Sequence, residues 1–561
     1  MVDVSVGACS FCRRCAWLLA VWLLAALVLL PAAAVHGQPT TWKQQAQALA
    51  PVDGVSSNSI QTVAADGDSL WVGPLLSVYV EADDRFLTAD VPELLEEDNV
   101  VFAIDATNNP GAPTSTVWAG LAFDTGGGTP GAAGFLFSTD GGDSFTARLP
   151  ALDGAADTTV AYGDSTFPAI PVTANDNSAP QSLDAAPPGG TVWTAAGQSG
   201  IRYSRDGGQT WQRAVLPPDT LDAVAPNETP SFLVGPPVSN DRGWLNYVGF
   251  SVLVDETGTV WAGTAGGVNR SRPQDIVGDD RAWQRFTATS TPDGLTGNSV
   301  VALAEQPRPD ARNAIWMATW ALNQTQSDRQ RFGVTVTRDG GATFEQTLIG
   351  EQVTDLAFRD ASARHPALVY AAGESGLLLS SDDGATWRTV ATFPLQDDTA
   401  FLRSDAQVQS VATTTSALWV GTNDGLLRLP RDREADLLVN DPAAPDPSWR
   451  LFRTNVPVNP EEPSETVPDV STYAYPNPFS PSDDAAVRIR YELPEAGPVT
   501  VEIFDFGMNR VRTLTRQQPA GQQEVAWNGR SADGLRLPNG TYFYTVDLGG
   551  RTVEGKILLV D

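Results

Sequence analysis

One short pattern, Ser/Thr-x-Asp-x-Gly-x-Ser/Thr-Trp/Phe, occurs four times in the chain and constrains its fold more than any other feature. The side chain of Asp accepts hydrogen bonds from N–H groups a few residues on, and Gly adopts a positive φ without steric cost. The pattern therefore predicts four tight turns between strands, each followed by an aromatic residue that packs beneath the turn. The defining residues are Ser138, Asp140, Gly142 and Phe145; Ser204, Asp206, Gly208 and Trp211; Thr337, Asp339, Gly341 and Phe344; and Ser380, Asp382, Gly384 and Trp387.

A second pattern, hydrophobic-Trp/Tyr-x-Gly/Ala, occurs seven times at spacings of 47 to 75 residues. Such spacings are expected when each copy is an inner strand of a four-stranded blade and the loops vary in length. The sequence thus predicts an all-β fold with a seven-bladed β-propeller over residues 40–455, in which blades two, three, five and six carry the turns. We expect an N-terminal strand near Trp42 to close the ring by pairing into the last blade; eight blades are the alternative. The seven aromatic residues are Trp71, Trp118, Trp193, Trp261, Trp316, Tyr370 and Trp419.

The four turns resemble the Asp boxes, or BNR repeats, of sialidases, sortilin-type receptors, two-domain xyloglucanases and photosystem assembly factors. These families share blades but no single activity, so the resemblance implies fold and not function. A sialidase core needs an Arg triad that opens before the first Asp box, and residues 53–135 offer only Arg85. The pieces Asp53-Gly-Val and Asp293-Gly-Leu resemble the periplasmic sensor propellers of two-component regulators. We predict no catalytic residue.

Residues 473–561 show alternating strands separated by turn residues, which predicts a small immunoglobulin-like (Ig-like) sandwich. This segment resembles the C-terminal sorting domain of type IX secretion cargo and the Ig-like domain of the flagellar hook-capping protein. The resemblance implies that the secretion machinery is a partner. Where the family often has Tyr-Asp before a basic turn, this chain has Phe504-Asp-Phe506-Gly507. The matching residues include Pro476, Asn477, Pro478, Gly540, Tyr542 and Lys556.

Between these two parts the chain is rich in Pro, Asp and Glu. The stretch from Arg431 to Val470 is typical of a stiff, extended linker, apart from an expected strand around Trp449. We place the linker between the two domains after that strand, at residues 456–472.

The first 37 residues are predicted to be a Sec signal peptide, because an apolar run at 16–30 follows Arg13-Arg14 and precedes small residues. A membrane anchor is the alternative, but the run is short for a span of about 20 residues. The only cysteines, Cys9, Cys12 and Cys15, lie in this segment, and His365 is the one histidine certain to remain after cleavage. Thiol catalysis, disulfides, Ser-His-Asp chemistry and His-based metal sites are therefore not expected.

The chain carries a formal net charge of −31, which excludes nucleic acid as a natural partner. Lysine occurs only at Lys43 and Lys556. An acidic, Lys-poor exported protein is typical of salt-adapted organisms, where salt screens self-repulsion; a GC-rich genome that prefers Arg is the alternative explanation.

These observations favour a monomeric, non-enzymatic propeller, secreted or held at the outer surface of a Gram-negative-type bacterium, that binds a polysaccharide or a protein. A glycoside hydrolase or lyase with carboxylates in the funnel and an envelope sensor or assembly factor are the alternatives. The long insertions Leu149–Gly190 and Trp211–Tyr247 are the candidate ligand loops over the funnel. No cofactor is predicted, and calcium on an exposed turn would be unspecific.

Overall fold

The computed structural model describes residues 47–560 except 53–54, 56–57, 91–98, 108–113, 126–128, 186–189, 238–242, 273–275, 278–279, 289–293, 323–329, 363–365, 397–401, 403–405, 440–446, 453–470, 476, 482–485 and 519. The predicted signal peptide, His365, Pro476 and most of the predicted linker lie outside the described residues.

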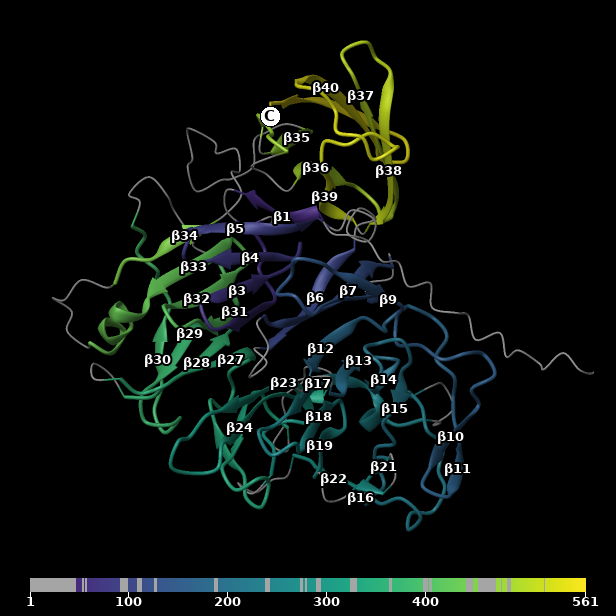
Figure 1. Ribbon diagram of the computed structural model, residues 1–561, viewed down its shortest axis with the longest axis vertical. Helices are drawn as coiled ribbons and strands as arrows, with labels where there is room; N and C mark the ends of the chain where they lie inside the picture. The colour runs from purple at the N-terminus through teal and green to yellow at the C-terminus, as the bar shows by residue number, and fades with distance from the viewer. Residues whose placement is uncertain are drawn as a thin grey trace, which may run out of the picture. The chain divides into compact units, whose positions relative to one another are not determined.

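Seven antiparallel sheets form the larger part of the described chain, and each is one blade of a propeller (Figure 1). Blade 1 consists of β1 (Gln47–Val52), β2 (Val63–Asp66), β3 (Ser69–Val72), β4 (Ser77–Val80) and β5 (Arg85–Asp90), and blade 2 of β6 (Val100–Thr107), β7 (Thr116–Asp124), β8 (Pro130–Ser138) and β9 (Thr146–Arg148). Blade 3 consists of β12 (Pro180–Ala185), β13 (Val192–Ala196), β14 (Gly200–Ser204) and β15 (Gln212–Arg213), and blade 4 of β16 (Ala223–Val224), β17 (Gly249–Val254), β18 (Val260–Thr264), β19 (Gly267–Ser271) and β22 (Trp283–Phe286). Blade 5 consists of β23 (Ser299–Gln306), β24 (Ala314–Trp320), β25 (Gly333–Thr337) and β26 (Glu345–Thr347). Blade 6 consists of β27 (Val353–Arg359), β28 (Leu368–Gly373), β29 (Gly376–Ser380) and β30 (Arg388–Val390). Blade 7 consists of β31 (Val408–Thr413), β32 (Ala417–Thr422), β33 (Gly425–Pro430) and β34 (Arg450–Phe452).

The innermost strands of the blades are β2, β6, β12, β17, β23, β27 and β31, and each contacts the next in this order, with β31 returning to β2. The prediction of a seven-bladed β-propeller is thus confirmed. The seven predicted Trp/Tyr strands are the second strands of the blades, and their aromatic side chains are at most 2% exposed.

The predicted closing strand near Trp42 lies outside the described residues, and the N-terminal strand that the structure describes, β1, does not pair into the last blade. Blade 7 takes all four strands from the end of the propeller segment, β31 to β34, and β1 pairs instead with β5 at the outer edge of blade 1. Side chains close the ring: the Tyr79 ring of blade 1 lies 4.7 Å from the Trp419 ring of blade 7, and Arg428 pairs with Glu81 at 2.5 Å.

The strand order places the loops on two faces of the ring. The connection from the outer strand of one blade to the innermost strand of the next emerges on one face, together with the turn between the second and third strands; we name this the crossover face. The connection between the third and fourth strands emerges on the opposite face, the turn face. All four repeated turns lie on the turn face, in blades 2, 3, 5 and 6.

One part of the predicted linker is instead packed structure. Residues Arg431–Leu438 form a 3-10 segment, η4, between β33 and β34, in which Glu434 and Leu437 are buried. The sequence does not indicate this segment, because its charged residues are typical of exposed chain. In the structure, Glu434 is buried and pairs with Arg359.

The smaller part is a sandwich of two sheets with the strand orders β35-β36-β39 and β38-β37-β40-β41, which confirms the predicted Ig-like fold. Its strands alternate buried and exposed side chains; in β37, Val499, Val501 and Ile503 are buried. The strands are β35 (Thr472–Tyr475), β36 (Val487–Leu493), β37 (Gly497–Phe504), β38 (Arg510–Gln518), β39 (Gly521–Trp527), β40 (Gly540–Asp547) and β41 (Thr552–Leu559).

Candidate functional site

Each repeated turn is held by one hydrogen-bond scheme. In blade 3, the hydroxyl of Ser204 donates to Asp206 Oδ1 at 2.8 Å and accepts from the N–H of Gly208 at 2.8 Å. The N–H of Thr210 donates to Asp206 Oδ1 at 2.9 Å, and its hydroxyl donates to Oδ2 at 2.6 Å. The same bonds form around Asp140, Asp339 and Asp382.

These bonds hold the four carboxylates ionised. Burial works against ionisation of Asp140, Asp206 and Asp339, but the bonds from neighbouring hydroxyl and N–H groups outweigh it and lower the pKa of each. At Asp382 the hydrogen bond from Thr386 is the main cause of the lowered pKa. Because both oxygens of each carboxylate are engaged within its own turn, these residues act structurally.

The glycine of each turn packs against the tryptophan of the preceding blade. A Cβ added to Gly208 would lie 2.9 Å from the Trp118 ring, and one added to Gly384 would lie 2.6 Å from the Trp316 ring. Gly142 and Gly341 meet Trp71 and Trp261 in the same way. The two sequence repeats are therefore two halves of one contact that joins consecutive blades.

Blades that lack the turn cover the preceding aromatic residue with other side chains. Trp193 meets the guanidinium of Arg281 at 5.4 Å from its ring centre, and Trp419 meets Tyr79. The hydroxyl of Tyr370 donates to Glu434 of η4 at 3.0 Å.

In the Ig-like part, the described sorting-motif residues join strands of the sandwich. Asn477 Nδ2 donates to the carbonyl of Lys556 at 3.0 Å, and Asn477 Oδ1 accepts from the N–H of Leu558 at 2.8 Å. The hydroxyl of Tyr542 donates to the carbonyl of Pro538 at 2.8 Å, and its ring lies 5.5 Å from Trp527. Gly540 begins β40, and Pro478 lies in the segment before β36. Their role in sorting stays a prediction.

Sequence reasoning missed a set of carboxylates on the innermost strands. Asp105 Oδ2 accepts the N–H of Ala185 in the next blade at 2.9 Å, and Asp184 Oδ2 accepts the N–H of Val254 in the blade after that at 2.8 Å. Asp355 Oδ2 accepts the N–H of Val411 at 2.9 Å. The sequence offers little signal for them beyond a single Asp within a strand, which differs from the adjacent acidic pairs typical of surfaces.

Burial raises the pKa of these carboxyl groups. It brings the pKa of Asp105 to about 6 and that of Asp355 to about 7, although backbone N–H bonds act in the opposite direction. The pKa of Asp184 lies well above its ordinary value because of burial and then the charge of Asp105. These are the most strongly raised carboxyl pKa values in the described chain, and all three groups also hold one blade to the next.

Serine side chains complete this inner ring of contacts. The hydroxyl of Ser251 donates to the carbonyl of Val300 at 2.8 Å, and that of Ser410 donates to Ile60 at 3.0 Å, where the ring closes. Both serines, like Asp355, directly follow an irregularity in the innermost strand, which directs the side chain toward the next blade.

The two long insertions interact with each other and with the side of the ring. The N–H of Ile170 donates to Val234 at 2.9 Å, and β16 of the second insertion extends blade 4 at its outer edge. The first insertion carries the hairpin β10 (Thr159–Tyr162) and β11 (Ser165–Pro168), and the Tyr162 hydroxyl donates to the carbonyl of Arg281 at 2.8 Å. These parts of the insertions therefore pack at the outer side of blades 3 and 4, whereas the Asn177 carbonyl of the first insertion accepts the N–H of Gln198, in the turn between β13 and β14 on the crossover face, at 2.7 Å. A ligand site over the funnel stays a prediction.

A buried carboxylate anchors the first insertion to blade 3. Asp153 pairs with Arg202 at 2.8 Å and with Arg213 at 2.5 Å, and all three side chains are at most 6% exposed. Burial opposes ionisation of Asp153, but the hydrogen bond and charge of Arg202 lead the effects that hold its pKa below the ordinary value. This anchor explains why the insertion is packed rather than extended into solvent.

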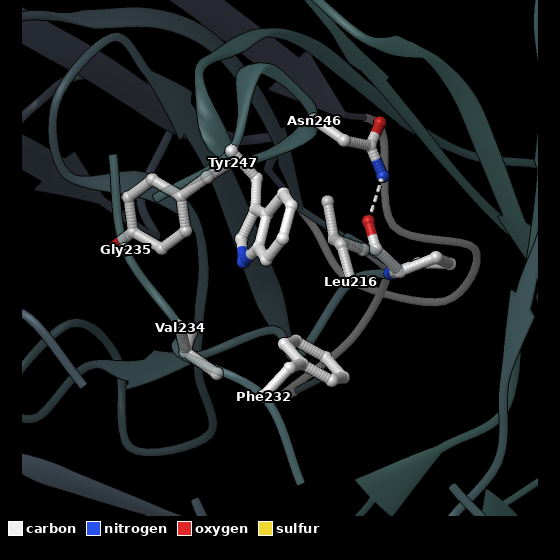
Figure 2. A pocket seen from close by; sticks show the side chains of 8 residues that line it. Leu216, Phe232, Val234, Gly235, Asn246 and Tyr247 are labelled. Carbon is white, nitrogen blue, oxygen red and sulfur yellow. Dashed lines mark hydrogen bonds between the residues drawn. The ribbon is translucent and has the colours of Figure 1, made fainter. Parts of the chain in front are cut away.

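The second insertion lines a small pocket, shown in Figure 2. The wall is mostly apolar, and its polar groups are engaged: Trp244 Nε1 donates to Leu233, Asn246 Nδ2 to Pro217, and the Tyr247 hydroxyl to Ser199. This pocket therefore offers mainly apolar contacts. The lining residues are Leu216, Pro217, Phe232, Val234, Gly235, Trp244, Asn246 and Tyr247.

Half-exposed aromatic rings mark the crossover face at blades 5 and 6. Trp320, at the end of β24, lies 6.3 Å from Phe332, and Gly350 N–H donates to the carbonyl of Phe332 at 2.8 Å. Ile349, which is 48% exposed, directly precedes Gly350 in this loop. The crossover face therefore carries a pair of partly exposed aromatic rings and an exposed apolar residue in a neighbouring loop.

The described residues contain no group of three or more His, Cys, Asp or Glu side chains arranged to hold a metal ion. In the same part of the chain, no helix has the length and apolar character needed to cross a bilayer.

Residues 477–550 match the family model of the FlgD Ig-like domain. No curated protein matches the chain. Among solved structures, it is similar to PorZ, described as a surface component of the type-IX secretion system of Porphyromonas gingivalis, at 16% identity and a TM-score of 0.41 over 91% of this chain and 60% of that chain. It thus spans less than two thirds of that protein.

Two further structures are similar at comparable levels. YCF48 from Cyanidioschyzon merolae is 17% identical over 69% of this chain and 99% of that chain, with a TM-score of 0.39. An ancestral GH74 enzyme is 13% identical over 91% of this chain and 63% of that chain, with a TM-score of 0.44.

Proposed function

We propose that this protein is a secreted or cell-surface propeller that binds an extracellular polysaccharide or protein without transforming it. The observation that carries the proposal is the pair of partly exposed rings of Trp320 and Phe332 on the crossover face, with the exposed Ile349 in a neighbouring loop, because exposed aromatic rings stack on sugar rings or anchor a protein partner. The inner-strand carboxylates support binding over catalysis, because each accepts a backbone N–H from the next blade.

The test is a glycan array probed with the purified protein in concentrated salt. We expect a polysaccharide ligand to be retained, and Phe332→Ala to weaken its binding by about tenfold, the loss expected for one stacked ring. The control is Leu149→Ala, which changes an exposed apolar residue distant in sequence from Phe332. Undiminished binding by Phe332→Ala would show that these side chains do not form the binding site. Binding to none of the glycans on the array would exclude the polysaccharide ligands tested and favour a protein ligand.

We propose further that the four repeated turns are structural Asp boxes and that a Sec-type signal peptide and the C-terminal domain direct export by a type IX-like route. The family-model match over residues 477–550 supports a domain of the right kind at this end of the chain. Deletion of residues 473–561 should leave the propeller in the periplasm, measured by cell fractionation. Delivery of the truncated chain to the surface would contradict the route.

One observation favours a second function, a glycoside hydrolase or lyase. Asp105 and Asp184 lie on adjacent inner strands and interact electrostatically, and raised carboxyl pKa values are typical of general acids. If this function holds, Asp184→Asn should abolish release of reducing ends from a polysaccharide that the wild type cleaves. Turnover that survives this substitution would exclude Asp184 as the acid.

A further inference from the structure

Two turns of the Ig-like domain expose large apolar side chains. Phe506 is 79% and Met508 is 63% exposed in the turn between β37 and β38, and Leu535 is 67% exposed in the loop after β39. No other large apolar side chain among the described residues is as exposed as these three. We name Phe506, Met508 and Leu535 the apolar tip. Exposure of this kind, gathered in one place, is typical of an interaction site.

The two turns lie at the same end of the sandwich. The N–H of Ala532 donates to the carbonyl of Val511 at 2.8 Å, and Arg512 Nη1 donates to the carbonyl of Ser531 at 3.1 Å. The loop that carries Leu535 therefore lies against the first residues of β38, immediately after the turn that carries Phe506 and Met508.

Hydrogen bonds fix both turns in shape. Asp505 accepts the N–H of Asn509 at 2.8 Å and returns its own N–H to the Asn509 carbonyl at 2.9 Å, with Met508 between them at a φ of 60°. The second turn is closed in a similar way, because the N–H of Ser531 donates to the carbonyl of Leu535 at 2.9 Å. Because the backbone of each turn is held, the exposed apolar side chains keep a fixed place at this end of the sandwich, where the Phe506 ring lies 6.3 Å from that of Phe543 in β40.

The charges around the apolar tip differ from those of the rest of the chain. Residues 471–561 hold nine basic and eleven acidic residues, whereas the whole chain has a net charge of −31. Arginines outnumber acidic residues in the two segments that form the tip. The arginines are Arg510, Arg512, Arg530 and Arg536, and the acidic residues are Glu502, Asp505 and Asp533.

We propose that the apolar tip inserts into an anionic lipid surface. Phe506, Met508 and Leu535 enter the boundary between headgroups and acyl chains, and the neighbouring guanidinium groups face the lipid phosphates. A protein partner is the less suitable occupant, because a stable protein interface needs about 800 Å² from each side and three protruding side chains on two turns present much less. The inference goes beyond the proposed ligand binding and does not depend on it.

The test uses a polarity-sensitive dye on the full chain. Met508→Cys is labelled in a chain in which Cys9, Cys12 and Cys15 are replaced by Ser, so that the dye reports only the surroundings of position 508. Val439→Cys, an exposed apolar position of the propeller outside the proposed ligand-binding surface, is the matched control. Vesicles contain phosphatidylglycerol and phosphatidylcholine in equal parts.

We expect the dye at position 508 to shift to the blue when vesicles are added, and the dye at position 439 to stay unchanged. Phe506→Ser with Leu535→Ser should weaken vesicle binding by about tenfold or more, as the transfer of two large apolar side chains requires. Vesicles of phosphatidylcholine alone should give a weaker shift. An absent shift at 508, an equal shift at both positions, or a shift caused by raising the protein concentration without vesicles would overturn the proposal; the last result would indicate a second copy of this chain.

Discussion

At the scale of single residues, glycine decides how closely two blades approach. Gly384 has a φ of 88° and lies against Trp316, whereas Gly350 has a φ of 97° and no atom within 4 Å of an added Cβ. Both positions therefore carry the backbone cost of a left-handed residue, and only Gly384 carries the steric contact.

Gly384→Ala should lower the free energy of unfolding by about 1 to 3 kcal/mol more than Gly350→Ala, because the new methyl group overpacks the tryptophan. Urea denaturation of the two variants measures the difference. Equal losses would mean that the glycine is needed only for its φ.

Asp355 makes stability depend on pH at the same scale. Its folded pKa, raised by burial to about 7, lies above the ordinary value near 4. Between these pH values folded Asp355 binds a proton that unfolded Asp355 does not, so the contribution of this group to stability is fully present below pH 4 and is lost as pH rises through 7.

Asp355→Asn should remove this fall. We expect the unfolding free energy of the wild type to decrease by at least about 1 kcal/mol between pH 5 and 8, and that of Asp355→Asn to change less. Denaturation midpoints across this range provide the measurement, and parallel curves would assign the dependence to other groups.

At the scale of elements, η4 takes the place of a missing turn. Glu434 is fully buried, pairs with Arg359 at 2.7 Å and accepts the hydroxyl of Tyr370, so it joins blade 7 to blade 6 as the glycine contact does elsewhere. Burial and then the charge of Glu434 raise the pKa of Tyr370.

Glu434→Ala should cost about 3 to 5 kcal/mol of stability, because it leaves the guanidinium of Arg359 buried without its partner. Asp432→Ala, an exposed acidic residue of the same segment, should change stability by less than about 0.5 kcal/mol. Similar losses for both variants, measured by chemical denaturation, would contradict the role of η4 as a clamp.

At the scale of the whole molecule, the charge of −31 opposes compaction. Sodium chloride at about 0.5 M shortens the Debye length to roughly 4 Å and should raise the thermal midpoint by several degrees. Sucrose at equal osmolality is the control, because it is excluded from the protein surface but does not screen charge. A midpoint that sucrose raises as much as salt does would speak against repulsion, and with it against adaptation to salt.

The number of blades and the position of their turns follow from the sequence, because both depend on local chemistry. A turn held by Asp206, Gly208 and Thr210 closes within seven residues, and the strand that carries Trp118 is recognisable from its own pattern. The Ig-like domain was predictable for the same reason, since alternation along a strand needs no knowledge of distant residues.

The inner ring and the closure were not predictable in this way. Asp105, Asp184 and Asp355 have no distinctive neighbours in sequence, and only the ring brings each to a backbone N–H of the next blade. Closure through Tyr79 and Trp419 joins residues 340 positions apart, so no local pattern distinguishes it from strand exchange.

The sequence by itself therefore determined the blades, the turns and the sandwich, because the turn hydrogen bonds and the apolar patterns of the strands are local in sequence. The tertiary structure alone decided that each turn glycine meets the tryptophan of the preceding blade, that the hairpin β10–β11 and β16 pack at the outer side of the ring, and that Phe506, Met508 and Leu535 gather at one end of the sandwich. These arrangements depend on contacts between segments far apart in the chain, whose pairing is fixed only when the whole fold excludes water around them.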